Sequence, residues 1–268
     1  IVAEAEELKA ERNRISKSIG QMIKAGEDPQ TIKAQVREMG DKISAFDEEL
    51  REVDAALRDS LLVIPNMPSA TTPVGKDEPA NPVIRSWGEK KMLDFEPKPH
   101  WDLGTELGLF DLERGAKIAG SGFPLFTGRG AKLERALIQF MLDLHTEEHG
   151  YTEIAPPFMC NAAAMTGTGQ LPKFAEDMYN VTLDELYPIP TAEVPVTNMY
   201  CDEILDQALP ILHTAYTPCF RREAGSAGKD TRGLLRVHQF DKVEMVKFTT
   251  PETSEAEHET LTADAEKV

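Results

Sequence analysis

The sequence predicts an α+β fold, an antiparallel sheet with flanking helices, preceded by a long antiparallel helical hairpin. Through residues 1–64, apolar residues recur at steps of three and four, which is the spacing of a coiled-coil seam. Residues 219–248 instead alternate with a period of two, which is typical of strands. Residues 65–99 are rich in proline, glycine and charge and are interpreted as a linker. The expected organisation is therefore an arm over residues 1–64, a linker over 65–99 and a main domain over 100–268.

The arm is expected to consist of two helices of unequal length. Their seams cover residues 1–22 and 32–64, and a turn at residues 25–29 separates them, with Asp28 as N-cap and Pro29 as the first helical residue. At about 1.5 Å per residue, the second helix is about 50 Å long and the first only about 36 Å. We therefore expect the natural chain to begin earlier, so that the remaining apolar seam is covered.

A helix followed by a strand is expected between residues 130 and 157. Leu133, Leu137, Phe140 and Leu144 have helical spacing on a segment bounded by two glycines, and a strand over residues 151–154 follows, before two prolines. A helix of the core is the simplest interpretation of this apolar stripe.

Two strands around a polar loop form the candidate functional site. Alternation gathers chemically useful side chains on one face of each strand, those of Cys219, Arg221 and Glu223 on the first and those of His238, Phe240, Lys242 and Glu244 on the second. The other face of the second strand can supply a core through Val237, Val243 and Met245. Residues 224–236 are too polar for a tight turn and are expected to form a loop over a ligand. A guanidinium binds phosphate or carboxylate through two hydrogen bonds, and an aromatic ring can stack on a purine. Cross-strand ion pairs on a solvated face are the alternative.

Five segments carry a family resemblance: 167–174 (GTGQLPKF), 191–198 (TAEVPVTN), 220–226 (FRREAGS), 230–234 (DTRGL) and 238–244 (HQFDKVE). The last three resemble motif 2 of the class II aminoacyl-tRNA synthetases, and all five are similar to the seryl-tRNA synthetases. Residues 130–157 resemble motif 1, which implies a homodimer through that motif. The resemblance thus implies the class II antiparallel sheet and a coiled-coil arm that contacts tRNA.

The resemblance implies a cytoplasmic serine–tRNA ligase that uses ATP and Mg²⁺ to form seryl-adenylate and transfers serine to tRNA(Ser); charging of tRNA(Sec) is left open. Arg221 would act catalytically on the α-phosphate, Glu223 would accept from the adenine amino group, and Phe240 would stack on adenine. The implied ATP-binding set is Arg221, Arg222, Glu223, Val237 and Phe240. The implied serine-binding set is Thr191, Ala192, Glu193 and Glu244, whose two carboxylates can accept from the serine ammonium and hydroxyl.

Charge and cysteine content add limits. The net charge of −17 opposes binding of RNA except where positive charge is concentrated. Between positions 9 and 24 there are five basic residues and one acidic residue. The resemblance makes Arg12, Arg14, Lys17 and Lys24 candidate tRNA contacts, and a solvated helix face is the alternative. Three widely spaced cysteines and the lack of an apolar run of about 20 residues agree with a cytoplasmic protein.

Three other functions are compatible with parts of the sequence. His145 to His149 matches the H-x-x-E-H pattern of zinc proteases, although a histidine beside Gly150 also suits the dipole at a helix end. Residues 225–231 suggest a P-loop, but Glu223 stands where its first glycine is required. A non-catalytic synthetase-like protein that binds RNA or a partner is the third alternative. Because no motif 3 precedes Val268, we expect residues 1–268 alone to form no adenylate.

Overall fold

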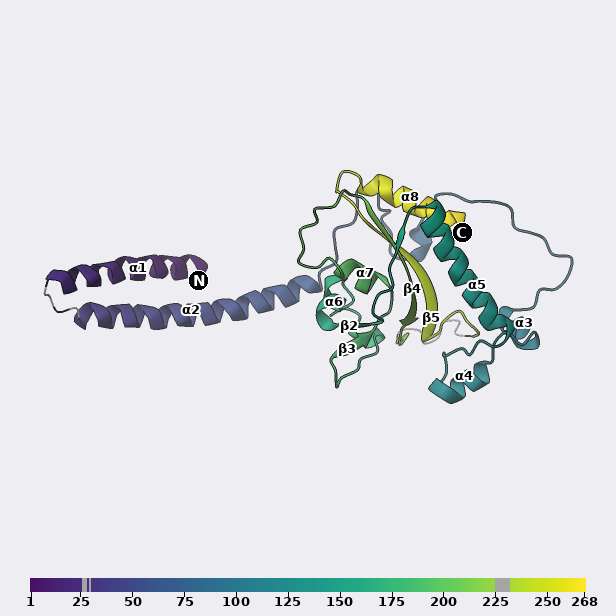
Figure 1. The fold of residues 1–268 in the computed structure, drawn as a ribbon, viewed down its shortest axis with the longest axis horizontal. Coiled ribbons are helices and arrows are strands. Elements are labelled where there is room, and N and C mark those ends of the chain that lie inside the picture. The colour runs from purple at the N-terminus through teal and green to yellow at the C-terminus, as the bar shows by residue number, and fades with distance from the viewer. Residues whose placement is uncertain (26–27, 29, 225–231) are drawn as a thin grey trace. The chain divides into compact units, whose positions relative to one another are not determined.

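The computed structural model describes residues 1–25, 28, 30–224 and 232–268, without the side chains of residues 20–25. It divides the chain into two compact units, residues 1–72 and residues 73–268. The first unit holds the two N-terminal helices, and the second holds the sheets and the remaining helices (Figure 1). The expected functional boundaries at residues 64/65 and 99/100 stay a prediction.

The first unit is an antiparallel pair of helices, α1 (Val2–Ala25) and α2 (Gln30–Leu62) (Figure 1). This confirms the predicted helical arm. Ala5 and Ile43, which belong to the two predicted seams, are buried. Lys9 also joins the helices, because its Nζ donates a hydrogen bond to Asp47 Oδ1 at 2.9 Å.

The ends of the two helices agree with the expected turn and with the difference in length. The Asp28 carboxylate accepts a hydrogen bond from the Gln30 N–H at 3.0 Å, as an N-cap does, whereas Pro29 lies outside the described residues. Helix α1 has 24 residues and α2 has 33. Val53 and Leu57, two residues of the predicted seam in the last third of α2, are about half exposed.

The second unit contains a three-stranded and a two-stranded sheet, which confirms the α+β class. The larger sheet has the order β1–β4–β5, in which β1 is parallel to β4 and β4 is antiparallel to β5. Its strands are β1 (Thr152–Glu153), β4 (Ile211–Phe220) and β5 (Gln239–Phe248). The smaller sheet pairs β2 (Met159–Asn161) with β3 (Leu186–Pro188) in antiparallel fashion.

Helices pack on both sides of the β4–β5 pair, with α6 and α7 on one side and α5 on the other (Figure 1). The helices of this unit are α3 (His100–Glu106), α4 (Leu112–Ala119), α5 (Arg129–Asp143), α6 (Ala162–Gly167), α7 (Glu193–Asn198) and α8 (Ser254–Lys267), with short helical turns η1 (Glu78–Ala80), η2 (Leu144–Glu148) and η3 (Ala175–Asp177). In the described part of the chain, none of the helices has the length and apolarity that crossing a bilayer requires.

The position of the core differs from the prediction for β5. Val237, Val243 and Met245 are only half-buried. The packed cluster of Ala192, Val196 and Ala215, with Ile154 and Val246 against it, lies on the opposite face, because Ala215 and Val246 point toward α7. The face that carries the predicted site therefore becomes core where α7 covers it.

The apolar stripe of α5 is largely uncovered. Leu133, Leu137 and Phe140 are 50–53% exposed, whereas Leu144 is buried. The interpretation as a core helix is therefore wrong for the first three residues, since within the described residues no element covers them fully.

Candidate functional site

Two adjoining cavities lie at the end of the β4–β5 pair where the polar loop begins. Cavity A, of about 520 Å³, has Thr191, Glu193, Lys242 and Glu244 in its wall. Cavity B, of about 790 Å³, is lined by Leu234, Leu235, Val237 and Phe240 and reaches Glu78. Arg221, Glu223 and Arg236 line both. A ligand in A and a ligand in B would therefore meet beside the same two arginines.

One carboxylate organises the wall of cavity A. Glu244 Oε2 accepts hydrogen bonds from Thr191 Oγ1 at 2.6 Å and from the Glu193 N–H at 3.0 Å. Lys242 Nζ lies 3.0 Å from the same oxygen and donates to Thr191 Oγ1 at 2.7 Å. The alternation of β5 places Lys242 and Glu244 on one face. Thr191, just before α7, and Glu193, the first residue of α7, lie next to them. The structure thus brings together three of the four predicted serine-binding residues.

At this wall of cavity A, the carboxylates of Glu193 and Glu244 lie beside the ammonium group of Lys242. Burial raises the pKa of Glu193, and the charge of Glu244 raises it further, whereas Lys242 acts to lower it. A wall with two carboxylates and a hydroxyl suits a small ligand that carries several hydrogen-bond donors, such as an ammonium and a hydroxyl.

Arg221 is held at the junction of the two cavities. It follows β4, and its N–H donates to the His238 carbonyl at 2.9 Å. Its Nε donates to the Pro190 carbonyl at 3.3 Å, and its guanidinium carbon lies 5.1 Å from the centroid of the Phe240 ring. Such cation–π contacts favour a fixed orientation of the guanidinium. The remaining N–H groups can point toward an anionic ligand.

Glu223 reaches the site by a different route from the one predicted. The strand ends at Phe220, and Glu223 has φ of +51°, so it does not continue the alternation with Arg221. The reason is tertiary: the Arg222 N–H donates to the Asp177 carbonyl at 2.8 Å, which takes the chain away from β5. Glu223 nevertheless lines both cavities, with its Oε2 3.0 Å from Arg236 Nη1.

The other predicted residues have contrasting surroundings. Val237 and Phe240 line cavity B. Ala192 is fully buried in the cluster that packs α7 on the sheet, so its side chain is unavailable to a ligand. Arg222 is exposed, and within the described residues it lines neither cavity.

Several residues of cavity A were not assigned from the sequence. Gln170 and Phe174 line it, and both belong to segment 167–174, whose resemblance was noted without a role. Arg236 belongs to the polar loop, where its charge was the available signal. For Lys242, the alternation predicts the strand face correctly but indicates no function.

The predicted tRNA contacts lie on α1. Arg14 and Lys17 are exposed and Arg12 is half-buried. Arg14 Nη2 lies 3.5 Å from Glu11 Oε1. The side chain of Lys24 lies outside the described residues.

Of the two rival motifs, the structure describes only the one with the two histidines. His145 Nδ1 and His149 Nδ1 are 3.0 Å apart, a hydrogen-bond distance, and burial and the neighbouring His149 lower the pKa of His145. Over the described ranges, His, Cys, Asp and Glu form no group of three or more that could hold a metal. The suggested P-loop at residues 225–231 lies outside those ranges.

Comparison with known protein families gives two matches. Residues 1–68 match the model of the seryl-tRNA synthetase N-terminal domain. Residues 178–268 match the tRNA synthetase class II core domain of the G, H, P, S and T type. The helical arm and the region with the two long strands therefore each match a synthetase family model.

Similar proteins of known name and structure agree. The chain is 56% identical to a serine–tRNA ligase of Trichlorobacter lovleyi and 57% identical to one of Pelobacter propionicus, over its whole length. It spans 63–64% of the length of these relatives. The crystal structure of seryl-tRNA synthetase from Pyrococcus horikoshii complexed with ATP matches 99% of this chain and 64% of that one, with 38% identity and a TM-score of 0.89. A serine–tRNA ligase from Naegleria fowleri in complex with AMP, at 24% identity and a TM-score of 0.81 over 99% of this chain and 65% of its own, supports the fold.

Proposed function

Because the chain belongs to the seryl-tRNA synthetase family of the class II aminoacyl-tRNA synthetases, we propose that the protein activates L-serine with ATP and transfers it to tRNA(Ser). In the first step, the serine carboxylate attacks the α-phosphorus of ATP, and seryl-adenylate and pyrophosphate form. In the second step, a hydroxyl of the terminal ribose of the tRNA attacks the seryl carbonyl, and AMP leaves. Neither step needs a side-chain nucleophile.

The observation that carries this proposal is that Arg221 lines both cavities. An amino acid in cavity A and a nucleotide in cavity B would bring carboxylate and α-phosphate together beside its guanidinium. Correct placement of two reactants lowers the barrier by removing the entropy cost of their encounter. A fixed positive group also stabilises the charge that develops on the phosphoryl oxygens.

The nucleotide would bind in cavity B. We assign Arg221 to the α-phosphate, Glu223 to the adenine amino group and Phe240 to stacking on the adenine ring, with the backbone near Val237 beside the nucleotide. The shared cavity of these four residues supports this assignment. Arg222 belongs to the ATP-binding set only because of its position in the Phe-Arg-x-Glu segment. Because its side chain is exposed, we expect it to contribute little to ATP binding.

Serine would bind in cavity A. Its ammonium would donate to Glu193, and its hydroxyl would donate to Glu244. Thr191 would hold Glu244 through its hydroxyl, and Ala192 would contribute through its backbone. A site whose polar groups pair with a substrate hydroxyl rejects the analogue without it, because those groups are then left unpaired. Alanine is therefore expected to be excluded without editing.

We expect Mg²⁺ to bind together with ATP. Within the described ranges, no group of three or more acidic, histidine or cysteine side chains could hold a metal, so these residues do not form a protein cage for it. Mg²⁺ is commonly bound through substrate phosphates and one or two carboxylates.

The proposed partners are a second copy of the chain and tRNA(Ser), and the proposed location is the cytoplasm. The exposed apolar stripe of Leu133, Leu137 and Phe140 on α5 supports a homodimer through motif 1. Arg14 and Lys17, exposed on α1, support contact of the arm with tRNA(Ser); charging of tRNA(Sec) stays open. Three unpaired cysteines agree with a cytoplasmic location.

The test is ATP–pyrophosphate exchange by the complete protein with each of the twenty amino acids. Exchange with serine alone supports the proposal. No exchange by a folded dimer that still binds RNA would favour the non-catalytic alternative. The expectation that residues 1–268 alone form no adenylate is measured in the same assay.

A further inference from the structure

Lys242 lies in the wall of cavity A without an assigned role. We propose that Lys242 is a positioning residue for the amino acid: it fixes the direction of the Thr191 hydroxyl and holds one oxygen of Glu244, so that the other oxygen is presented to the hydroxyl of the substrate. The inference rests on the proposed function and adds a residue that determines specificity without touching the reacting atoms.

The direction of the hydrogen bonds follows from the chemistry of the donors. An ammonium has protons to donate and no acceptor. At 2.7 Å from Lys242 Nζ, Thr191 Oγ1 must therefore accept. Its own proton then goes to Glu244 Oε2 at 2.6 Å. Without Lys242 this oxygen would keep the Glu193 N–H, at 3.3 Å, as its donor, and one of its acceptor positions would be open to the substrate ammonium.

The two oxygens of Glu244 are consequently unequal. Oε2 receives the Thr191 hydroxyl, the Glu193 N–H and the Lys242 ammonium. Among the described residues, no donor is within hydrogen-bond distance of Oε1. Because Glu244 lines cavity A, Oε1 is the acceptor that remains for a ligand.

Lys242 also sets the charge of this wall. The titratable and charged groups that line cavity A are Asp177, Glu193, Arg221, Glu223, Arg236, Lys242 and Glu244. Of the two arginines, Arg236 is paired with Glu223 at 3.0 Å, and Arg221 is held by Pro190 and Phe240. Lys242 is thus the cation in direct contact with Glu244, and it opposes the rise in the pKa of Glu193.

The expected effect of losing this cation has a definite sign. A nearby opposite charge favours the ionised form of a carboxyl group, typically by about 1 to 3 pKa units. Replacing Lys242 by a neutral residue should therefore raise the pKa of Glu193 further. Protonation of Glu193 would then remove an acceptor for the serine ammonium at a higher pH, and serine binding would weaken on the acid side first.

The experiment compares Lys242→Met, Lys242→Arg and the control Lys267→Met, an exposed position in the last turn of α8, in the complete protein. Serine-dependent pyrophosphate exchange is measured from about pH 5.5 to about pH 8.5, where kcat/KM reports groups of the free enzyme. We expect Lys242→Met to raise KM for serine about 10-fold to 100-fold, to change kcat less than about 3-fold, and to shift the acid limb of kcat/KM to higher pH by at least about one unit. Lys242→Arg should restore the acid limb, and Lys267→Met should match the wild type.

Two outcomes separate this inference from the proposed function. If the wild type shows serine-dependent exchange and Lys242→Met leaves both KM and the acid limb unchanged, the inference is wrong and the proposed function stands. If the wild type shows no such exchange, the proposed function fails, and ¹³C NMR titration of the Glu193 carboxyl in residues 1–268 decides about Lys242. A higher pKa of Glu193 in a folded Lys242→Met variant would then support the role of Lys242 in setting the charge, and an unchanged value would overturn it.

Discussion

The two faces of strand β5 carry the same kinds of side chain and use them differently. On one face, Lys242 and Glu244 line a cavity. On the other, Lys247 is almost fully buried and donates to Glu257 at 3.0 Å and to Thr260 at 2.7 Å.

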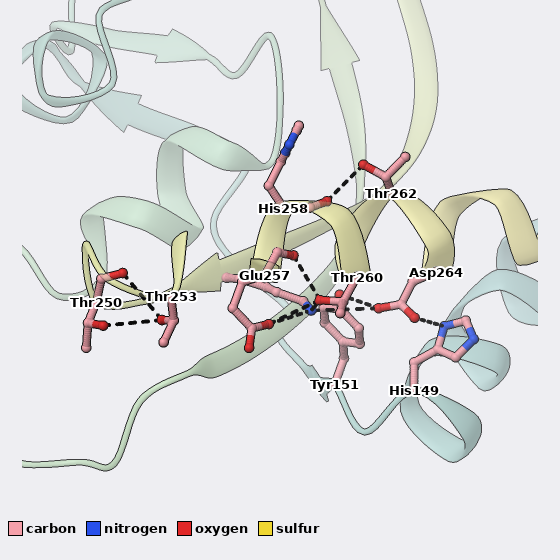
Figure 2. A network of polar contacts seen from close by, with 10 residues as sticks. His149, Tyr151, Thr250, Thr253, Glu257, His258, Thr260, Thr262 and Asp264 are labelled. Carbon is pink, nitrogen blue, oxygen red and sulfur yellow. Dashed lines mark hydrogen bonds and ion pairs between the residues drawn. The ribbon is translucent and has the colours of Figure 1, made fainter. Parts of the chain in front are cut away.

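The second face belongs to a closed network that ties α8 to the sheet, which Figure 2 shows from close by. Asp264 accepts from the Tyr151 hydroxyl at 2.8 Å and lies 3.7 Å from His149. Within this network each charged group meets another part of the protein. On the first face, one oxygen of Glu244 has no such partner among the described residues. Polar residues on a strand therefore indicate a ligand-binding site when one of their hydrogen-bond acceptors faces a cavity without a protein donor.

The largest effect is expected from the removal of Arg221, which lies at the junction of the two cavities. Arg221→Ala should lower the rate of adenylate formation about 100-fold or more, because the loss of a fixed positive group at the phosphate commonly has that effect. Pyrophosphate exchange by the complete protein measures it. The matched control Arg222→Ala, one residue away and exposed, should change the rate less than about 3-fold; equal effects of the two substitutions would overturn the assignment.

Glu244→Gln tests the acceptor itself. The amide cannot accept at both ends, so kcat/KM for serine should fall about 10-fold to 100-fold, since hydrogen bonds to a charged group contribute about 1.5–3 kcal/mol. The preference for serine over alanine should fall with it, in exchange assays that compare the two amino acids. Glu257→Gln on the opposite face is the control, and a similar loss there would argue that Glu244 acts only through folding.

Lys247→Met asks whether the closed network is structural. It leaves the Glu257 and Asp264 carboxylates without their buried cation, so the free energy of unfolding should fall by about 1–3 kcal/mol. Urea unfolding measures this. The KM for serine should stay within about 2-fold of the wild type, in contrast to Lys242→Met. A large increase in KM at unchanged stability would contradict the division of roles.

The smallest expected effect is a pH dependence of stability that arises on the second face. Burial and the neighbouring Asp241 raise the pKa of Glu134 from 4.5 to about 7. The folded protein therefore holds this proton more tightly than the unfolded chain does. The stabilisation is fully present below about pH 4.5 and is lost as the pH rises through about 7.

Glu134→Gln provides the measurement, because it removes the titrating proton. Urea unfolding of the wild type and of the variant is measured at a series of pH values between about 4.5 and about 7. The free energy of unfolding of the wild type should fall more steeply over this range than that of the variant. The two curves should differ most in slope near neutral pH. Parallel curves would show that Glu134 titrates normally.

Local pattern was sufficient for much of the site. The period-2 alternation of β5 placed Phe240, Lys242 and Glu244 correctly, because a strand of ten residues keeps its alternation regardless of what packs on it. The helical arm was equally predictable, since its seam is encoded in residue spacing.

Long-range contacts account for the errors. Glu223 was placed on a strand because nothing local indicates that the Asp177 carbonyl, far earlier in the chain, takes the Arg222 N–H. Val243 and Met245 were expected in the core because the sequence does not say which face α7 covers. The exposed stripe on α5 was likewise read as core, because an apolar helix face has the same spacing whether its partner is the same chain or another.

The distribution of the three cysteines has a practical consequence. Cys219 is fully buried opposite Phe240, and Cys160 is buried as well. Burial raises the pKa of both thiols, which keeps them in the unreactive protonated form. Cys201 is exposed. A fluorophore or spin label that reacts with thiols should therefore attach to Cys201 first and leave Cys219 unmodified. Substrate-induced motion can then be followed by spectroscopy without any substitution.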